Sequence, residues 1–307
     1  MRDMIRLAVR LLALLGINAA AGWGLLCLHE TSLPDYAPWE TDSRLLIMPE
    51  DKHLDAAFLG SSRAYLFSRF QANHAITEAE LGRTVFNMAM PSGGGVRPAR
   101  FYFEEFLARG NRCDVLVYFL DPFVFFATGP NDGHKFVWFE PFRLDFFLRM
   151  ARDGYPRAQL VDYLRSKFGR DWLFQRRELL VEHRSALTPN DLDPERIRMR
   201  RDHLYYQGLS DATFRRYRRE FVRIAERCER EGICLVVIIP PTLLGAEPGA
   251  KALVDWLQEE RKRVTFGFHD YVDAVPEPRY FYNLDHLNTE GVRRFMRGFV
   301  APALNGE

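Results

Sequence analysis

The most informative pattern along the chain is an alternation of short apolar runs with longer amphipathic stretches. The apolar runs predict buried strands at about 54–59, 84–88, 114–120, 233–239 and 264–268. Stretches with helical periodicity follow at about 64–81, 97–109, 211–231, 248–263 and 289–300. This order is typical of an α/β fold, here a flavodoxin-like, doubly wound parallel sheet of about five strands. Ligands of such sheets bind beyond the carboxyl ends of the strands.

The start of the chain has a different pattern. Arg2, Arg6 and Arg10 precede an apolar run over 11–28, a length of 18 residues that is at the lower limit for crossing a bilayer. Basic residues before the run place the N-terminus in the cytoplasm and the remaining chain on the periplasmic or extracellular side of the inner membrane. A signal peptide cleaved near Ala19–Ala21 is one alternative. A buried N-terminal helix of a soluble protein is another.

These patterns divide the chain into a membrane anchor or signal peptide (1–28), a linker (29–50) and an α/β domain (51–307). The sheet pattern is interrupted over 122–208, which begins rich in aromatic residues and becomes rich in arginine. We expect this segment to be a largely helical insertion or cap. Its aromatic residues suit core packing, an acyl pocket or contact with the membrane.

Composition narrows the possible classes of function. A formal net charge of +1 gives no reason to expect a nucleic-acid partner. None of the four cysteines forms a Cys-x-x-Cys pair, so we expect no metal site, and no cofactor motif is present. The glycines at 93–95 are not followed by a Walker or dinucleotide pattern, which makes a phosphate-binding protein the weakest interpretation.

The end of the first predicted strand carries the clearest chemical signal. Gly60, Ser61, Ser62 and Arg63 follow the apolar run and lead into a helical pattern. A hydroxyl is thereby placed at the carboxyl edge of the sheet, beside the free N–H groups of a helix start. A serine nucleophile needs this geometry, but a serine that caps the helix would have the same sequence. Arg63 suits either an anionic substrate or an ion pair on the helix surface.

A second polar stretch precedes the last predicted helix. It contains His286, which is a candidate general base for a hydroxyl at the first strand. Asn288 and Thr289 in the same stretch also suit the start of a helix, so capping is the alternative interpretation.

Taken together, the two stretches resemble the SGNH (GDSL-like) hydrolase superfamily. In that family a first strand ends in Gly-Asp-Ser, and a C-terminal Asp-x-x-His motif continues as His-x-Asn-x-x-Gly. Gly60-Ser61-Ser62 matches the first motif with serine in the aspartate place, and His286 to Gly291 match the second. The serine variant and the apolar N-terminus most resemble the membrane-anchored branch that contains DltD and exopolysaccharide O-acetylation proteins. The resemblance covers about 54–120 and 211–303.

The resemblance implies a role for each matching residue. Ser62 would be the nucleophile and His286 the base, and the N–H groups of Ser62 and Gly93 would hold the oxyanion. Asn131, in a Gly-Pro-Asn-Asp sequence, corresponds to a further oxyanion donor of the family, although such a sequence is more often a turn.

The group that orients His286 is less clear from the sequence. The family's aspartate position holds Asn283, and the nearest carboxylate, Asp285, is directly adjacent to the histidine. Adjacent side chains in extended backbone point apart, so Asp285 would need a turn to reach the ring. The alternatives are another carboxylate, such as Asp121 after the third strand, or a weak dyad of Ser62 and His286.

We therefore expect a membrane-anchored, envelope-facing serine acyltransferase or esterase that forms an acyl-Ser62 intermediate. Its acceptor would be a cell-surface glycan or a lipid-linked polymer. The alternative is a catalytically reduced accessory subunit of a membrane O-acyltransferase system, which Asn283 favours. A multi-span membrane O-acyltransferase is a candidate partner in both cases.

Overall fold

The computed structural model describes residues 2–32, 48, 50–90, 94–132, 143–166 and 182–306. The chain divides into two compact units. The first comprises Met1–Tyr36 and Val137–Arg177, and the second comprises Ala37–Phe136 and Glu178–Glu307. The sequence motifs that carry candidate chemistry all lie in the second unit.

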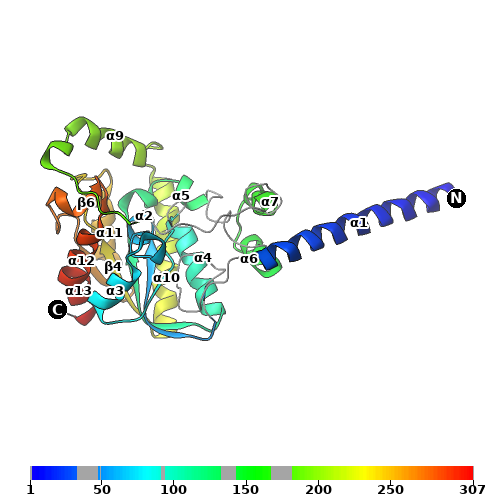
Figure 1. Cartoon of the computed structure of the whole chain (residues 1–307), viewed down its shortest axis with the longest axis horizontal. Coiled ribbons are helices and arrows are strands. Elements are labelled where there is room, and N and C mark those ends of the chain that lie inside the picture. Colours follow the sequence, from blue (N-terminus) through cyan, green and yellow to red (C-terminus); the bar gives the residue numbers. More distant parts are fainter. Residues whose placement is uncertain are drawn as a thin grey trace. The chain divides into compact units, whose positions relative to one another are not determined.

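The first unit contains the long N-terminal helix α1 (Arg2–Ser32), drawn in blue in Figure 1. Its segment Met4–Leu25 spans 22 residues, has a mean hydropathy of 1.7 and is not buried against any described part of the chain. The helix is therefore long and apolar enough to cross a bilayer. It also extends beyond residue 28, where the sequence pattern places the end of the apolar run.

The second unit is built on one parallel sheet. Its strands are β1 (His53–Gly60), β2 (Val85–Asn87), β3 (Arg112–Phe119), β4 (Cys234–Ile239) and β5 (Gly267–Asp270). The strand order is β2-β1-β3-β4-β5, and every neighbouring pair is parallel. This is the flavodoxin-like order, so the α/β fold class expected from the sequence is confirmed. β5 begins later than predicted because the apolar Val264 and Phe266 are buried in the turn before it.

Helices cover both faces of the sheet. Those that follow the strands are α2 (Ser62–Tyr65), α3 (His74–Leu81), α4 (Val96–Ala108), α10 (Asp211–Glu231), α11 (Ala250–Glu260), α12 (Thr289–Phe295) and α13 (Ala301–Asn305). A π-helix, Met296–Val300, joins α12 to α13. Figure 1 shows α3, α12 and α13 on one side of the sheet and α4 and α10 on the other, and α4 packs against α10.

The helix predicted over 64–81 is instead divided into α2, a 3-10 helix η2 (Arg69–Gln71) and α3. Ala72 adopts a left-handed conformation with φ of 56°, and the buried Asn73 side chain donates to the Leu66 carbonyl at 2.9 Å. A single helix cannot pass through these two residues, so η2 ends there and α3 begins after them. α2 is thus a single turn directly after β1.

Segment 122–208 contributes to both units. Its helices among the described residues are α5 (Gly129–Asp132), α6 (Leu144–Arg152), α7 (Arg157–Ser166) and α9 (Pro194–Leu204). α6 and α7 belong to the first unit, in which Phe146 and Tyr163 pack with ring centroids 5.2 Å apart. In the second unit, Phe125 and Phe126 are buried against Phe214 of α10, so these two aromatic residues are core.

The turn after β1 requires glycine at position 60. Gly60 has φ of 153°, and a Cβ there would lie 2.6 Å from both the Ala64 Cβ and the Phe119 carbonyl oxygen. We predict that Gly60→Ala lowers the free energy of unfolding by about 2–5 kcal/mol, because conformational strain and a steric clash add together. Chemical denaturation of the full-length protein in detergent measures this change.

Gly82→Ala is the matched control. Gly82 also has positive φ, at 60°, but a Cβ there would have no atom within 4 Å. The free energy of unfolding of this variant should fall by only about 1–2 kcal/mol, because the substitution causes backbone strain but no steric clash. Equal losses in the two variants would show that the close packing at Gly60 does not matter.

Candidate active site

Ser62 is the first residue of α2, at the carboxyl edge of the sheet. Ser61 occupies the N-cap position, but its side chain forms no capping bond. The Ser61 hydroxyl donates instead to the Asp121 carboxylate. Neither serine therefore caps the helix through its side chain, and the Ser62 hydroxyl is available for another partner.

That partner is His286, which lies 224 residues later in the chain. Its Nε2 is 2.9 Å from the Ser62 Oγ, and its Nδ1 is 3.0 Å from the Asn283 Oδ1. The same Asn283 oxygen accepts a bond from the Asp285 N–H at 3.0 Å, which identifies it as the carbonyl oxygen of the amide. Nδ1 must therefore carry the proton, and Nε2 is free to accept one from Ser62.

Asp285 reaches the imidazole as well. Its Oδ1 lies 3.3 Å from the His286 Nδ1. The two residues are adjacent, but the backbone here is not extended, because β6 (Phe281–Asn283) and β7 (His286–Leu287) form a tight antiparallel hairpin with a turn at 284–285. The turn brings Asn283 and Asp285 to the same ring nitrogen.

An arginine that the sequence did not single out completes this group. Arg200 of α9 donates from Nε to the Asp285 Oδ1 at 3.0 Å and from Nη2 to Oδ2 at 2.6 Å. Asp285 is only 3% exposed. Burial acts to raise the pKa of Asp285, but the bonds to His286 and Arg200 outweigh it and hold this pKa well below its usual range.

Arg63 is buried, contrary to the expectation of a substrate-binding or surface residue. Its guanidinium lies 3.1 Å from Asp121 and 3.0 Å from Glu247, and its side chain is 3% exposed. Burial acts to lower the pKa of Arg63, but the two carboxylates raise it above its usual value. Arg63 thus belongs to an internal charge cluster (Asp121, Arg63 and Glu247) beneath the Ser62 turn.

Asp121 does not orient His286. It forms its contacts with Ser61 and Arg63, and the structure shows no hydrogen bond between it and the imidazole among the described residues. Burial raises the pKa of Asp121, although the Arg63 charge opposes this shift. Its observed role is to hold the turn that presents Ser62.

Asn131 is not placed to donate to an oxyanion either. Its Nδ2 donates to the Val124 and Ala127 carbonyls at 2.6 and 2.8 Å, and its Oδ1 accepts from the Arg97 N–H at 3.1 Å. Both amide hydrogens are therefore committed to the backbone. The side chain is buried and joins the α5 segment to the start of α4.

Gly94, after β2, lies close to the Ser62 turn. Gly93, the predicted oxyanion donor, lies outside the described residues. A Cβ on the next residue, Gly94, would lie 2.6 Å from the Ser61 Cα, so any other residue there would displace the turn. Asn288, at the far end of the motif, caps α12 by accepting from the Gly291 N–H at 3.0 Å, as the capping pattern predicts.

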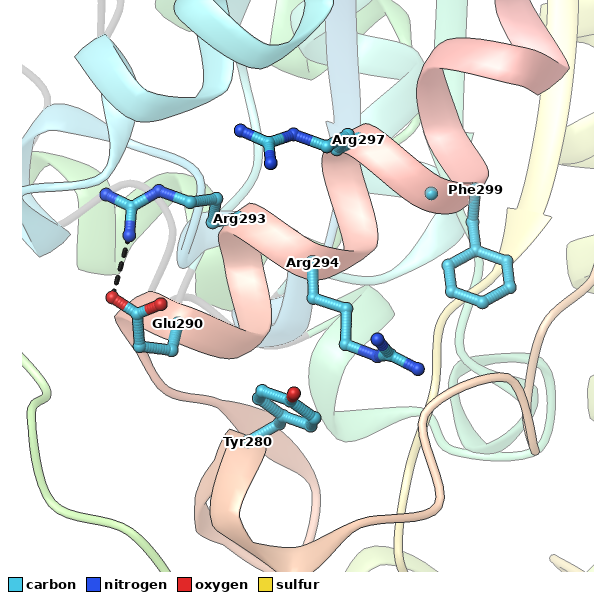
Figure 2. Close-up of a pocket in the computed structure, with 7 residues that line it drawn as sticks. Tyr280, Glu290, Arg293, Arg294, Arg297 and Phe299 are labelled. Atoms are coloured by element: carbon cyan, nitrogen blue, oxygen red, sulfur yellow. Dashed lines mark hydrogen bonds and ion pairs between the residues drawn. The ribbon is translucent and has the colours of Figure 1, made fainter.

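Among the described residues, no group of three His, Cys, Asp or Glu side chains could hold a metal ion. A cavity of about 420 Å³ lies along α12 and the π-helix, away from Ser62, and is lined by Tyr280, Glu290, Arg293, Arg294, Arg297, Gly298 and Phe299 (Figure 2). Its three arginines are already paired with acids: Arg293 with Glu290, Arg297 with Glu80 and Arg294 with Glu277. The cavity therefore offers no unpaired charge to a ligand.

Comparisons with known proteins found a distant structural similarity and no match in sequence. No protein-family model and no curated protein matches the chain. Among solved structures, it is similar to a protein from Bacteroides fragilis NCTC 9343 to which acylhydrolase activity has been ascribed. The two are 11% identical with a TM-score of 0.42, and the match covers 84% of this chain and 91% of the other. A likeness of this extent does not assign an activity.

The internal charge cluster beneath the Ser62 turn should be important for stability. We predict that Glu247→Ala lowers the free energy of unfolding by about 3–5 kcal/mol, because it removes one partner of a buried ion pair. Glu247 also accepts from the Tyr205 hydroxyl at 3.2 Å, and that bond is lost too. Denaturant unfolding followed by fluorescence measures the change.

Glu195→Ala is the control for this prediction. Glu195 also pairs with an arginine, Arg198, at 2.5 Å, but both side chains are more than half exposed. Its unfolding midpoint should match that of the unmodified protein. If Glu247→Ala unfolded at the same midpoint as Glu195→Ala, the internal cluster would contribute nothing measurable.

Proposed function

We propose that the protein is a serine acyl-transfer enzyme in which Ser62 is the nucleophile and His286 the general base. The observation that carries this proposal is the 2.9 Å contact between the Ser62 Oγ and the His286 Nε2, with Nδ1 facing two oxygen acceptors. A weak hydroxyl nucleophile needs such a base, and the base needs a third group that fixes its tautomer.

The reaction would proceed in two halves. The Ser62 proton passes to Nε2 as Oγ attacks the carbonyl carbon of an ester or thioester, and the leaving group then departs with that proton. A second hydroxyl, from water or an acceptor, gives its proton to Nε2 and attacks the acyl carbon. As the bond between that carbon and the Ser62 Oγ breaks, Nε2 returns the proton to Oγ. The N–H groups of Ser62 and Gly93 are the proposed oxyanion donors, each worth about 3–4 kcal/mol.

The catalytically reduced subunit remains a second candidate because of one specific feature. The acceptor closest to Nδ1 is the neutral Asn283 oxygen at 3.0 Å, and the Asp285 carboxylate is farther away at 3.3 Å. In a serine protease, asparagine in place of the triad aspartate lowers kcat about 10⁴-fold because it selects the wrong tautomer. Here the carbonyl oxygen of Asn283 selects the required tautomer. This favours a catalytic protein over a catalytically reduced subunit.

We also propose that the enzyme belongs to the membrane-anchored branch of the SGNH superfamily. The Gly-Ser-Ser and His-x-Asn-x-x-Gly motifs support this placement, as does the apolar α1. On this proposal the site faces the cell envelope, the acceptor is a glycan or lipid-linked polymer hydroxyl, and a multi-span O-acyltransferase supplies the acyl group. Partition of the acyl group between water and added glycan would separate an esterase from a transferase.

Covalent labelling tests the proposed nucleophile. A fluorophosphonate probe should react with the full-length protein, and Ser62→Ala should abolish the adduct detected by mass spectrometry. His286→Gln should slow labelling by about 10²–10⁴-fold because the general base is lost.

Ser61→Ala is the matched control, since the Ser61 hydroxyl is engaged by Asp121 and does not face His286. It should still be labelled. Labelling that persisted in Ser62→Ala, or no labelling of the unmodified protein, would refute the nucleophile and leave the accessory-subunit hypothesis.

Retention of α1 is tested by fractionation and intact mass. We predict that the protein stays in the membrane pellet after an alkaline carbonate wash and keeps its N-terminal residues. Leu14→Arg, near the centre of Met4–Leu25, should release part of it, because a charge there costs about 2.5–3.5 kcal/mol. A soluble product that begins after Ala21 would identify a cleaved signal peptide instead.

A further inference from the structure

Arg200 holds Asp285 in one orientation. The Asp285 Oδ1 lies between two donors, the Arg200 Nε at 3.0 Å and the His286 Nδ1 at 3.3 Å, and Oδ2 takes the second arginine bond at 2.6 Å. A bidentate guanidinium–carboxylate pair fixes the plane of the carboxylate as well as its distance. The carboxylate next to the imidazole is therefore fixed by a residue outside the hairpin.

The helix that carries Arg200 is capped at its start and attached to the charge cluster just after its end. α9 begins at a capped turn, where the Asp193 side chain accepts from the Glu195 N–H at 3.0 Å. Just after its last residue, the Tyr205 hydroxyl donates to Glu247 at 3.2 Å, and Glu247 pairs with Arg63. α9 is thus joined to Asp285 beside the base and to the charge cluster beneath the nucleophile.

Without Arg200, the buried Asp285 carboxylate would lose its ion pair and keep the neutral imidazole as its side-chain contact among the described residues. Such a group is costly to keep ionised and has no reason to stay aligned with Nδ1. Asn283 would then be the remaining partner of Nδ1, and its orientation depends on the bond from the Asp285 N–H to its Oδ1. Displacement of Asp285 would weaken that bond and let the amide turn its NH₂ group toward the ring. That orientation would select the tautomer in which Nε2 cannot accept the Ser62 proton.

We propose that Arg200 is a positioning residue: by clamping Asp285 it holds His286 in the Nδ1–H tautomer, so that α9 controls whether the base can accept the Ser62 proton. The effect of this clamp on catalysis rests on the function proposed above. The clamp itself can be measured without any substrate.

Several charged and titratable groups surround the imidazole, and each of them affects how the Arg200 variant is interpreted. The ones that face His286 or interact with its charge are Asp285, Tyr282, His183, Asp121 and, through Asp285, Arg63 and Arg200. Of these, only the Arg200 charge is removed in the test. A change in the tautomer of His286 would therefore report the clamp.

The experiment follows His286 directly by NMR of the full-length protein in detergent, with ¹⁵N-labelled histidine. The ¹⁵N shifts report the tautomer, and His286→Gln assigns the resonance. Arg200→Gln should convert a single tautomer into a mixture, because Asp285 is no longer held beside Nδ1. Arg200→Lys keeps the charge but cannot form the bidentate pair, so it should also give a mixture.

Arg198→Gln is the matched control on the same helix, since the partners of Arg198 within the described part of the chain are the exposed Glu195 and Asp202. It should leave the tautomer of His286 unchanged. The proposal is overturned if Arg200→Gln, or Arg200→Lys should the glutamine variant fail to fold, shows the same tautomer as Arg198→Gln.

Fluorophosphonate labelling of the same samples separates the two proposals. A tautomer mixture in Arg200→Gln together with slower labelling of Ser62 would support both. The same mixture in a protein that the probe never labels would support the clamp and refute the enzymatic function.

Discussion

The candidate site depends on one long-range contact, that between the Ser62 hydroxyl and the His286 imidazole. The parallel sheet makes it possible by ending β1 at the edge where the β6–β7 hairpin also lies. Gly60 then allows the chain to turn sharply enough for α2 to start with its first side chain facing the hairpin. The other features of the site hold either the Ser62 turn or the His286 ring in place.

Buried charge holds both sides in place. On the serine side, the cluster of Asp121, Arg63 and Glu247 fixes the turn through Ser61 and through the first turn of α2. On the histidine side, Asp285 is held between the imidazole and Arg200. Buried ion pairs contribute little net stability, but each partner is costly to lose, so they define one arrangement and disfavour others. α9 is joined to both groups, which couples the nucleophile to its base.

The imidazole has an unusual pair of partners. A neutral amide and a carboxylate share one N–H, and the carboxylate is partly neutralised by a guanidinium. The amide oxygen and the carboxylate together fix the orientation of the ring.

The sequence by itself determined the five strands of the parallel sheet, the Gly-Ser-Ser turn, the Asn288 cap and the apolar α1, because each depends on local periodicity or on the backbone needs of neighbouring residues. The resemblance of two motifs also indicated Ser62 and His286 as partners. Only the tertiary structure decided the β6–β7 hairpin and the other partners of the site. Arg200 lies in a strongly polar helix, whose pattern indicates a solvent-exposed face, and Glu247 lies in a loop. Asn131 matched a motif, yet its amide satisfies buried carbonyls. Pairing across the fold depends on which elements meet in space, and spacing along the chain does not encode it.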